Sequence, residues 1–282
     1  MENQIIGIIG TGVMGGGIAQ MFAENGFQAL IWDTADDVAA RGYGAIRKRL
    51  DGSVGKGKIT AAEAAAILGR IQPVRALEDL APASLVMEAI LEDLEAKRRL
   101  FSRLEQCLPP RTAIGTNTSS LSVVALAGAL SRPERFLGIH FFNPPTKLEL
   151  VELITTPVLD PAILEAARAL LSRCGKTVVT VTDSPGFIVN RLLLPLINEA
   201  ARLVHEGVAS AADIDTAMRL GAMHPAGPLQ VADLIGLDVC KTILESMSTS
   251  LDQPFHRPAS SIVALVDAGK LGRKTGEGFY KY

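Results

Sequence analysis

The sequence predicts an α/β protein with two parts, an N-terminal domain built on a mostly parallel sheet and an all-helical C-terminal domain. Three observations support this prediction. The chain has 282 residues, which suits about two domains of roughly 150 residues each. Short apolar segments alternate with helical patterns through its first two thirds, as in a parallel sheet covered on both faces. After Asp183 the apolar residues recur only at helical spacing.

Six segments are expected to form strands, because each is a short apolar run followed by a turn signal or a helical pattern. They are Ile5–Ile9, Gln28–Trp32, Leu85–Ala89, Thr112–Gly115, Phe136–His140 and Thr177–Val181.

Helices are expected between these strands. One should follow the first strand, run through Ala19 to about Asn25 and end at Gly26. Another should begin at Thr60, because Thr60 and Glu63 have the spacing of a capping box, and continue through an alanine-rich run to Leu68.

The pattern changes at Asp183-Ser184-Pro185-Gly186, where proline and glycine interrupt the chain. We therefore expect a domain of residues 1–183 and a helical domain of residues 184–282 for substrate binding and dimerisation. Its first helix should be kinked at Pro195, and a second should start at Ser210 to Asp213. The apolar residues at helical spacing in the first helix are Leu192, Leu196, Ile197, Ala200, Ala201 and Val204. The apolar excess of this domain suits a homodimer interface.

Composition limits the partners and the compartment. A formal net charge of −2 predicts neither a nucleic acid nor an anionic membrane as a partner, and no apolar stretch approaches the ~18 residues of a membrane span. Cys107, Cys174 and Cys240 are odd in number, widely spaced and without a CxxC pair, which argues against disulfides and a zinc site. The first residues lack the basic region of a secretory signal. We expect a cytoplasmic protein without a metal.

A glycine-rich motif follows the first predicted strand. In Gly10-Thr11-Gly12-Val13-Met14-Gly15, the first glycine allows a tight turn, the second lets the backbone approach a pyrophosphate, and the third permits close packing of helix and strand. The following helix would present unpaired N–H groups to the phosphates. This is the fingerprint of a Rossmann-type dinucleotide-binding domain. Its expected cofactor-binding residues are Gly10, Gly12, Val13, Met14 and Gly15.

Asp33 ends the second predicted strand, about 20 residues beyond the glycines. A carboxylate there would accept hydrogen bonds from the adenosine ribose and repel a 2'-phosphate, so NAD is favoured over NADP. The alternative is a glycine-rich turn that binds no dinucleotide, with Asp33 a strand-end carboxylate.

Polar residues follow two further strands, where open α/β sheets bind their ligands. Asn117-Thr118-Ser119-Ser120 comes after Gly115, and His140 starts the run His140-Phe141-Phe142-Asn143-Pro144. A histidine at that position suits a general base, and Glu152 could orient its ring and stabilise the imidazolium. The alternative is a core histidine, with one of the serines only capping the next helix.

Four motifs in order resemble the short-chain L-3-hydroxyacyl-CoA dehydrogenases, including bacterial 3-hydroxybutyryl-CoA dehydrogenases. The resemblance extends over essentially the whole chain. The motifs are Asn117-Thr118-Ser119-Ser120-Leu121, His140-Phe141-Phe142-Asn143-Pro144, Asp183-Ser184-Pro185-Gly186-Phe187-Ile188-Val189-Asn190-Arg191 and Gly272-Arg273-Lys274-Thr275-Gly276-Glu277-Gly278-Phe279-Tyr280.

The resemblance implies a role for each matching residue. His140 would be the catalytic base, Glu152 its acidic partner, and Ser119 and Asn190 the groups that bind the substrate. Because Asn190 lies beyond the predicted boundary, the active site is expected in the cleft between the domains. Further cofactor contacts are implied for Glu92, Lys97, Asn143 and Lys274.

A CoA substrate carries phosphates, so a local basic feature is expected. Arg47-Lys48-Arg49 together with Lys56 and Lys58 provides one, and the resemblance implies that Lys56 contacts CoA. A solvated helix end and loop is the equal alternative.

Two departures from the family pattern bear on the substrate. Pro145-Thr146-Lys147-Leu148-Glu149 replaces an apolar run that usually ends in Met-Lys, and Ala226 replaces a usual methionine. Neither affects His140 or Glu152, so they bear on the acyl chain and its carrier more than on the reaction.

The expected activity is the reversible NAD-dependent oxidation of an L-3-hydroxyacyl-CoA, 3-hydroxybutyryl-CoA for example, to the 3-oxoacyl-CoA. Two alternatives stay open: a related dehydrogenase whose substrate is bound to a carrier protein, and a non-catalytic NAD-binding protein of the crystallin type.

Overall fold

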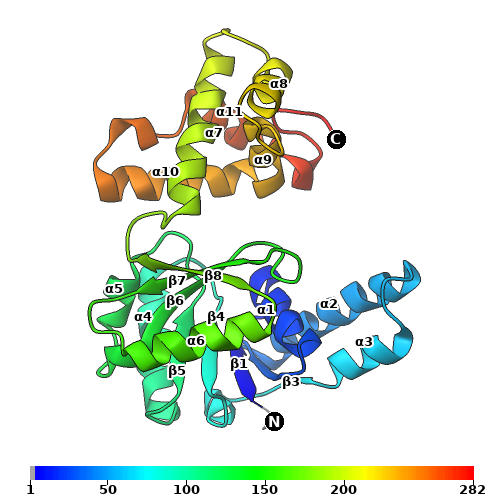
Figure 1. The fold of residues 1–282 in the computed structure, drawn as a ribbon, viewed down its shortest axis with the longest axis vertical. Coiled ribbons are helices and arrows are strands. Elements are labelled where there is room, and N and C mark those ends of the chain that lie inside the picture. Colours follow the sequence, from blue (N-terminus) through cyan, green and yellow to red (C-terminus); the bar gives the residue numbers. More distant parts are fainter. Residues whose placement is uncertain (1–3) are drawn as a thin grey trace. The chain divides into compact units, whose positions relative to one another are not determined.

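The computed structural model describes residues 4–282. The chain divides into two compact units, the first ending at Asp183 and the second running from Ser184 to Tyr282. Figure 1 shows the sheet and its helices in the first unit and helices alone in the second.

The first unit contains an eight-stranded sheet with the order β3-β2-β1-β4-β5-β6-β7-β8. Its first six strands are parallel in the order 3-2-1-4-5-6, which is that of dinucleotide-binding doubly wound sheets. The predicted fold class, a Rossmann-type domain followed by a helical one, is confirmed. The strands are β1 (Ile5–Ile9), β2 (Gln28–Trp32), β3 (Ile71–Pro73), β4 (Leu85–Glu88), β5 (Ala113–Thr116), β6 (Phe136–Phe141), β7 (Leu150–Thr155) and β8 (Thr177–Thr182).

All six predicted strands form, with ends shifted by at most one residue, but β3 and β7 were not predicted. Strand β3 has three residues and ends in Pro73, so it carries almost no periodic signal. Strand β7 contains the carboxylate of Glu152 within an apolar run and pairs antiparallel to β6. A charged residue in the middle of the strand interrupts the apolar run by which a buried strand is recognised in a sequence.

Helices cover both faces of the sheet (Figure 1). Helices α1, α2, α3 and α6 share one buried apolar cluster with the strands. On the opposite face the ring of Phe101 from α4 packs edge to face against Phe136 of β6, with 4.8 Å between centroids. The helices are α1 (Val13–Glu24), α2 (Asp36–Gly55), α3 (Ala61–Leu68), α4 (Leu94–Cys107), α5 (Val123–Ala127) and α6 (Pro161–Arg173), with short 3-10 turns η1 (Leu77–Leu80) and η2 (Pro133–Arg135). The predicted capping box forms, because Thr60 Oγ1 accepts from the Glu63 amide and Glu63 accepts from the Thr60 amide.

The second unit is helical around its own buried core, as predicted. Residues 184–282, all of them described, contain only two isolated bridges, Gly272 with Glu277 and Glu277 with Lys281. Pro195 lies inside α7, and Ser210 caps α8 by accepting from the Asp213 amide. None of the helices in residues 4–282 has the length and apolar character needed to cross a membrane. The helices are α7 (Val189–His205), α8 (Ala211–Gly221), α9 (Pro228–Ile235), α10 (Leu237–Leu251) and α11 (Ser260–Asp267), with 3-10 turns η3 (Pro254–His256) and η4 (Arg273–Thr275).

Candidate functional site

The carboxyl ends of β1, β4, β5 and β6 lie at one edge of the sheet, because these strands are parallel neighbours. The segments that follow them, residues 10–15, 89–93, 117–120 and 142–143, therefore gather at this edge, which is where open α/β sheets bind ligands. The predicted site residues of the first unit, other than Asp33, Lys97, Lys56 and Glu152, lie in these segments or at the end of β6.

The glycines of the fingerprint have the geometry that their roles require. Gly10 adopts a positive φ of 87° in the turn after β1. A Cβ on Gly15 would lie 1.8 Å from the carbonyl oxygen of Gly10, so no other residue fits there. A Cβ on Gly12 would meet nothing within 4 Å, and Gly12 is the N-cap of α1. Open space beside a helix N-terminus fits the pyrophosphate of a dinucleotide.

Asp33 is tied to this turn. Its Oδ2 accepts hydrogen bonds from the amide of Thr11 at 2.7 Å and from Thr11 Oγ1 at 2.8 Å, and its Oδ1 accepts from the Thr34 amide. These contacts hold the strand-end carboxylate beside the glycine turn, and its contact with a ribose stays a prediction. Val13 is exposed and Met14 half-buried at the start of α1. Thr11 was not predicted, since the second position of the motif tolerates many residues.

His140 and Glu152 form a buried pair. They lie directly opposite each other in the antiparallel ladder of β6 and β7, and 2.7 Å separates His140 Nδ1 from Glu152 Oε2. His140 is 5% exposed and Glu152 0% exposed. The Phe142 ring packs 4.6 Å from the imidazole centroid. A carboxylate on Nδ1 fixes the orientation of the ring and makes Nε2 the nitrogen suited to exchange a proton.

The loop after β5 is held by Glu92. Its Oε1 accepts hydrogen bonds from Thr118 Oγ1 at 2.5 Å, from the Ser119 amide at 2.8 Å and from the Ser120 amide at 3.0 Å. Burial raises the pKa of Glu92, but Lys97 and these donors outweigh burial and hold the pKa below its usual range. The carboxylate is therefore ionised at neutral pH and fixes the backbone around Ser119.

The same loop is joined to the histidine strand. Asn117 Oδ1 accepts a hydrogen bond of 2.9 Å from the backbone amide of Phe141, the residue after His140. The serine loop and the His140 pair are thereby held in one framework within the first unit.

Several predicted cofactor residues have other contacts in this structure. The Lys97 ammonium is 1% exposed and lies between Glu88, at 2.5 Å, and Glu92, at 3.3 Å. Asn143 is exposed after β6. Lys274 belongs to the second unit and pairs with Asp238. Their contacts with NAD stay predictions.

The substrate residues predicted outside this edge are placed as follows. Asn190 is 9% exposed in the first turn of α7, in the second unit. Lys56 caps the C-terminal end of α2 and is exposed, as is Lys58, whereas Arg49 donates through Nε to Gln20. The basic cluster is thus a helix end and an adjoining loop, and its contact with CoA stays a prediction.

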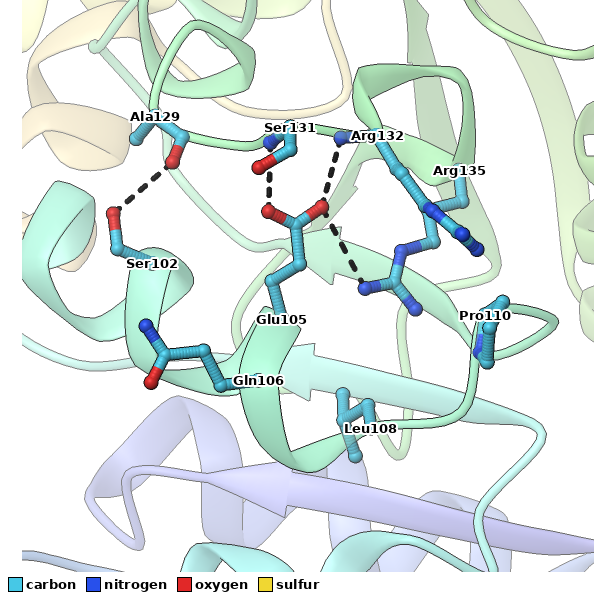
Figure 2. A pocket seen from close by; sticks show the side chains of 9 residues that line it. All are labelled: Ser102, Glu105, Gln106, Leu108, Pro110, Ala129, Ser131, Arg132 and Arg135. Carbon is cyan, nitrogen blue, oxygen red and sulfur yellow. Dashed lines mark hydrogen bonds and ion pairs between the residues drawn. The ribbon is translucent and has the colours of Figure 1, made fainter.

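A separate pocket of about 440 Å³ lies at the opposite edge of the sheet, where β5 and β6 begin (Figure 2). Glu105 accepts hydrogen bonds there from the amides of Ser131 and Arg132, and Arg135 donates to the carbonyl of Pro109. Figure 2 shows the Glu105 carboxylate directed at the amides of Ser131 and Arg132 and at the guanidinium of Arg135. Glu105 and Arg135 are engaged with backbone groups and with each other, and the predicted site residues lie elsewhere, so this pocket is not the candidate site.

Two family models match the chain. The one described as "3-hydroxyacyl-CoA dehydrogenase, NAD binding domain" matches residues 5–184, and "3-hydroxyacyl-CoA dehydrogenase, C-terminal domain" matches residues 186–282. Together they cover nearly the whole chain.

Full-length relatives are similar to the chain. A 3-hydroxybutyryl-CoA dehydrogenase of Bradyrhizobium diazoefficiens is 44% identical over 98% of this chain and 94% of its own length. The human mitochondrial hydroxyacyl-coenzyme A dehydrogenase is 40% identical over 98% of this chain and 90% of its own length. The crystal structure of (S)-3-hydroxybutyryl-CoA dehydrogenase from Ralstonia eutropha matches with a TM-score of 0.93 and 40% identity, covering 100% of this chain and 99% of that one.

Proposed function

The chain belongs to the 3-hydroxyacyl-CoA dehydrogenase family, an NAD-dependent oxidoreductase family, and from this premise we propose that it oxidises 3-hydroxybutyryl-CoA reversibly to acetoacetyl-CoA. The observation that carries the proposal is the buried pair of His140 and Glu152 at the carboxyl edge of an NAD-binding sheet, 2.7 Å apart.

His140 acts as the general base in this proposal. Bound NAD would supply the acceptor for the hydride of C3, and Nε2 of His140 would take the 3-hydroxyl proton, which leaves a 3-oxo group. Glu152, hydrogen-bonded to Nδ1, stabilises the imidazolium so formed. In the reverse direction the imidazolium returns the proton to the oxygen.

Ser119 positions the reacting oxygen in this proposal. Its loop is fixed by five hydrogen bonds to Glu92, one of them a long one of 3.5 Å from the Ser119 hydroxyl, so the donor is in place before the substrate arrives. Asn190 and Lys56 are proposed as further contacts of the substrate, and the glycine turn, Asp33, Glu92, Lys97, Asn143 and Lys274 as contacts of NAD.

Two broader proposals accompany this function. The chain forms a homodimer through its helical unit, whose surface exposes Leu192, Leu220 and Met223. It works in the cytoplasm, which suits the free thiols of Cys107, Cys174 and Cys240.

A substrate panel tests the proposal. NADH consumption is followed by absorbance with acetoacetyl-CoA, with longer 3-oxoacyl-CoAs and with acetoacetyl groups on a carrier protein. We expect the highest kcat/KM with acetoacetyl-CoA. A higher kcat/KM with the carrier-bound substrate would indicate a reductase that acts on carrier-bound thioesters. If no thioester is turned over, the proposed dehydrogenase activity is wrong.

A further inference from the structure

Glu88 is a fully buried carboxylate at the end of β4 that the proposed reaction does not use directly. Its Oε1 accepts hydrogen bonds from Lys97 Nζ at 2.5 Å and from the Ile90 amide at 2.6 Å. Its Oε2 accepts one of 2.6 Å from Thr116 Oγ1 at the end of β5. Burying a carboxylate costs solvation free energy, which hydrogen bonds to both of its oxygens offset here. These bonds hold Glu88 and its partners in one arrangement.

The ammonium of Lys97 is shared between two carboxylates. Nζ lies 2.5 Å from Glu88 Oε1 and 3.3 Å from Glu92 Oε2, and the lysine side chain is 1% exposed. The shorter contact keeps the ammonium close to Glu88. Its ion pair with Glu92 is to Oε2, whereas Oε1 accepts from other donors.

Those other donors belong to the serine loop. Glu92 Oε1 accepts from Thr118 Oγ1 and from the amides of Ser119 and Ser120. A continuous line of contacts thus runs from Glu88 through Lys97 and Glu92 to the backbone of Ser119.

We propose that Glu88 is a positioning residue for the reaction: it draws Lys97 away from the serine loop, so that Glu92 keeps one oxygen for that loop and Ser119 stays in its productive place. This inference rests on the proposed function. Without the Glu88 charge the ammonium moves toward Glu92, competes with the amides of residues 119 and 120, and displaces the hydroxyl that binds the reacting oxygen.

The central test is a double-mutant cycle of Glu88→Gln and Ser119→Ala, measured as kcat for acetoacetyl-CoA at saturating NADH. Glutamine preserves the size of the side chain, and Lys97 keeps Glu92 as a partner, so no charge is left unpaired in the core. We expect Glu88→Gln to lower kcat by at least about 10-fold, since small misplacements of reacting groups are costly. The double variant should lose about as much as Ser119→Ala alone.

Two further variants separate positioning from folding. Thr116→Val removes, at nearly constant side-chain size, the hydroxyl that donates to Glu88 and accepts a long hydrogen bond of 3.4 Å from the Thr118 amide. Thr116→Ser keeps this hydroxyl, so kcat should fall in the first variant and stay near wild type in the second. Glu105→Gln is the matched control, because this carboxylate caps backbone amides at the opposite sheet edge. It should leave kcat unchanged.

Failure of this inference can be told apart from failure of the proposed function. If the wild-type protein turns over no thioester, the proposed function is wrong. With an active wild type, an unchanged kcat in Glu88→Gln, or losses that multiply in the double variant, overturns the inference alone. If Glu88→Gln does not fold, the same cycle with Thr116→Val decides.

Discussion

Nδ1 of His140 and Oε2 of Glu152 lie 2.7 Å apart because their residues are direct partners in the only antiparallel strand pair within the described sheet. The chain reverses after β6, and twelve residues later the carboxylate returns opposite the imidazole. The pairing of these neighbouring strands fixes the spacing, so the two side chains are held by the sheet itself.

His140→Gln should reduce turnover of acetoacetyl-CoA by ~100-fold or more, the scale of a general base, and leave NADH binding intact. Steady-state kinetics and NADH fluorescence titration measure the two effects. Near-normal turnover in this variant would remove His140 from the mechanism.

Glu152→Gln should lower kcat by at least about 10-fold, because an amide can still accept from Nδ1 but cannot stabilise an imidazolium by charge. Glu149→Gln, which changes an exposed carboxylate just before β7, is the control and should retain wild-type kcat. Equal rates in the two variants would show that the Glu152 charge is dispensable.

Asp33→Ala should weaken NADH binding much more than NADPH binding, because the proposed role of this carboxylate is to bind the ribose hydroxyls and repel a 2'-phosphate. The substitution also releases Thr11, which affects both cofactors, so the ratio of the two Kd values is the decisive quantity. Thr11→Val removes the hydroxyl contacts with Asp33 and the Val38 carbonyl but keeps the amide contact with Asp33, so it should leave that ratio unchanged. An unchanged ratio in Asp33→Ala would contradict the ribose contact.

The sequence predicted the sheet well where local signals are strong. The first strand, its glycine turn and the strand ending beside Asp33 obey simple periodicities, and the structure reproduces them. Strand β7 was missed because the carboxylate of Glu152 interrupts its apolar run, although the residue itself was chosen for its chemistry. Only the tertiary fold explains why a charge can be buried there, since the partner imidazole comes from another strand.

Contacts between distant residues account for the rest of the site. Nothing in the spacing of Glu88, Lys97 and Thr116 reveals that they meet, because strand pairing and the packing of α4 bring them together. The family resemblance implied that Lys97 contacts the cofactor, and nothing in the sequence around it indicated that its ammonium lies between the carboxylates of Glu88 and Glu92. A charged residue at the buried end of a central strand is the one sequence signal that could have singled out Glu88.

The stability of the protein should decrease as the pH falls below about 6.5, in part because of His256. Its side chain is 3% exposed, and Nδ1 has no hydrogen-bond partner among residues 4–282. Burial, with a smaller contribution from Arg191, lowers its pKa. The unfolded chain then binds a proton at a pH where the folded chain does not, so acidification favours unfolding.

Thermal unfolding between pH 7.5 and 5.5 measures this effect. His256→Gln should lose less Tm over that interval than the wild type, whereas His205→Gln, which changes an exposed histidine of the same unit, should not reduce the loss. If His256→Gln loses as much Tm between pH 7.5 and 5.5 as the wild type, this histidine is not a cause of the acid destabilisation.

Two glycines of α2 should respond oppositely to alanine. A Cβ on Gly42 would lie 2.4 Å from Thr11 Cβ and 2.8 Å from the Thr11 carbonyl oxygen, so Gly42→Ala must displace the glycine turn. We expect it to destabilise the protein by about 1–3 kcal/mol and to weaken NADH binding. A Cβ on Gly44 meets nothing within 4 Å, so Gly44→Ala should stabilise the helix by up to about 1 kcal/mol and leave NADH binding unchanged. Urea unfolding and NADH titration of both variants provide the comparison. Normal NADH affinity in Gly42→Ala would mean that the turn tolerates displacement, and that Thr11 does not hold the cofactor site in register with Asp33.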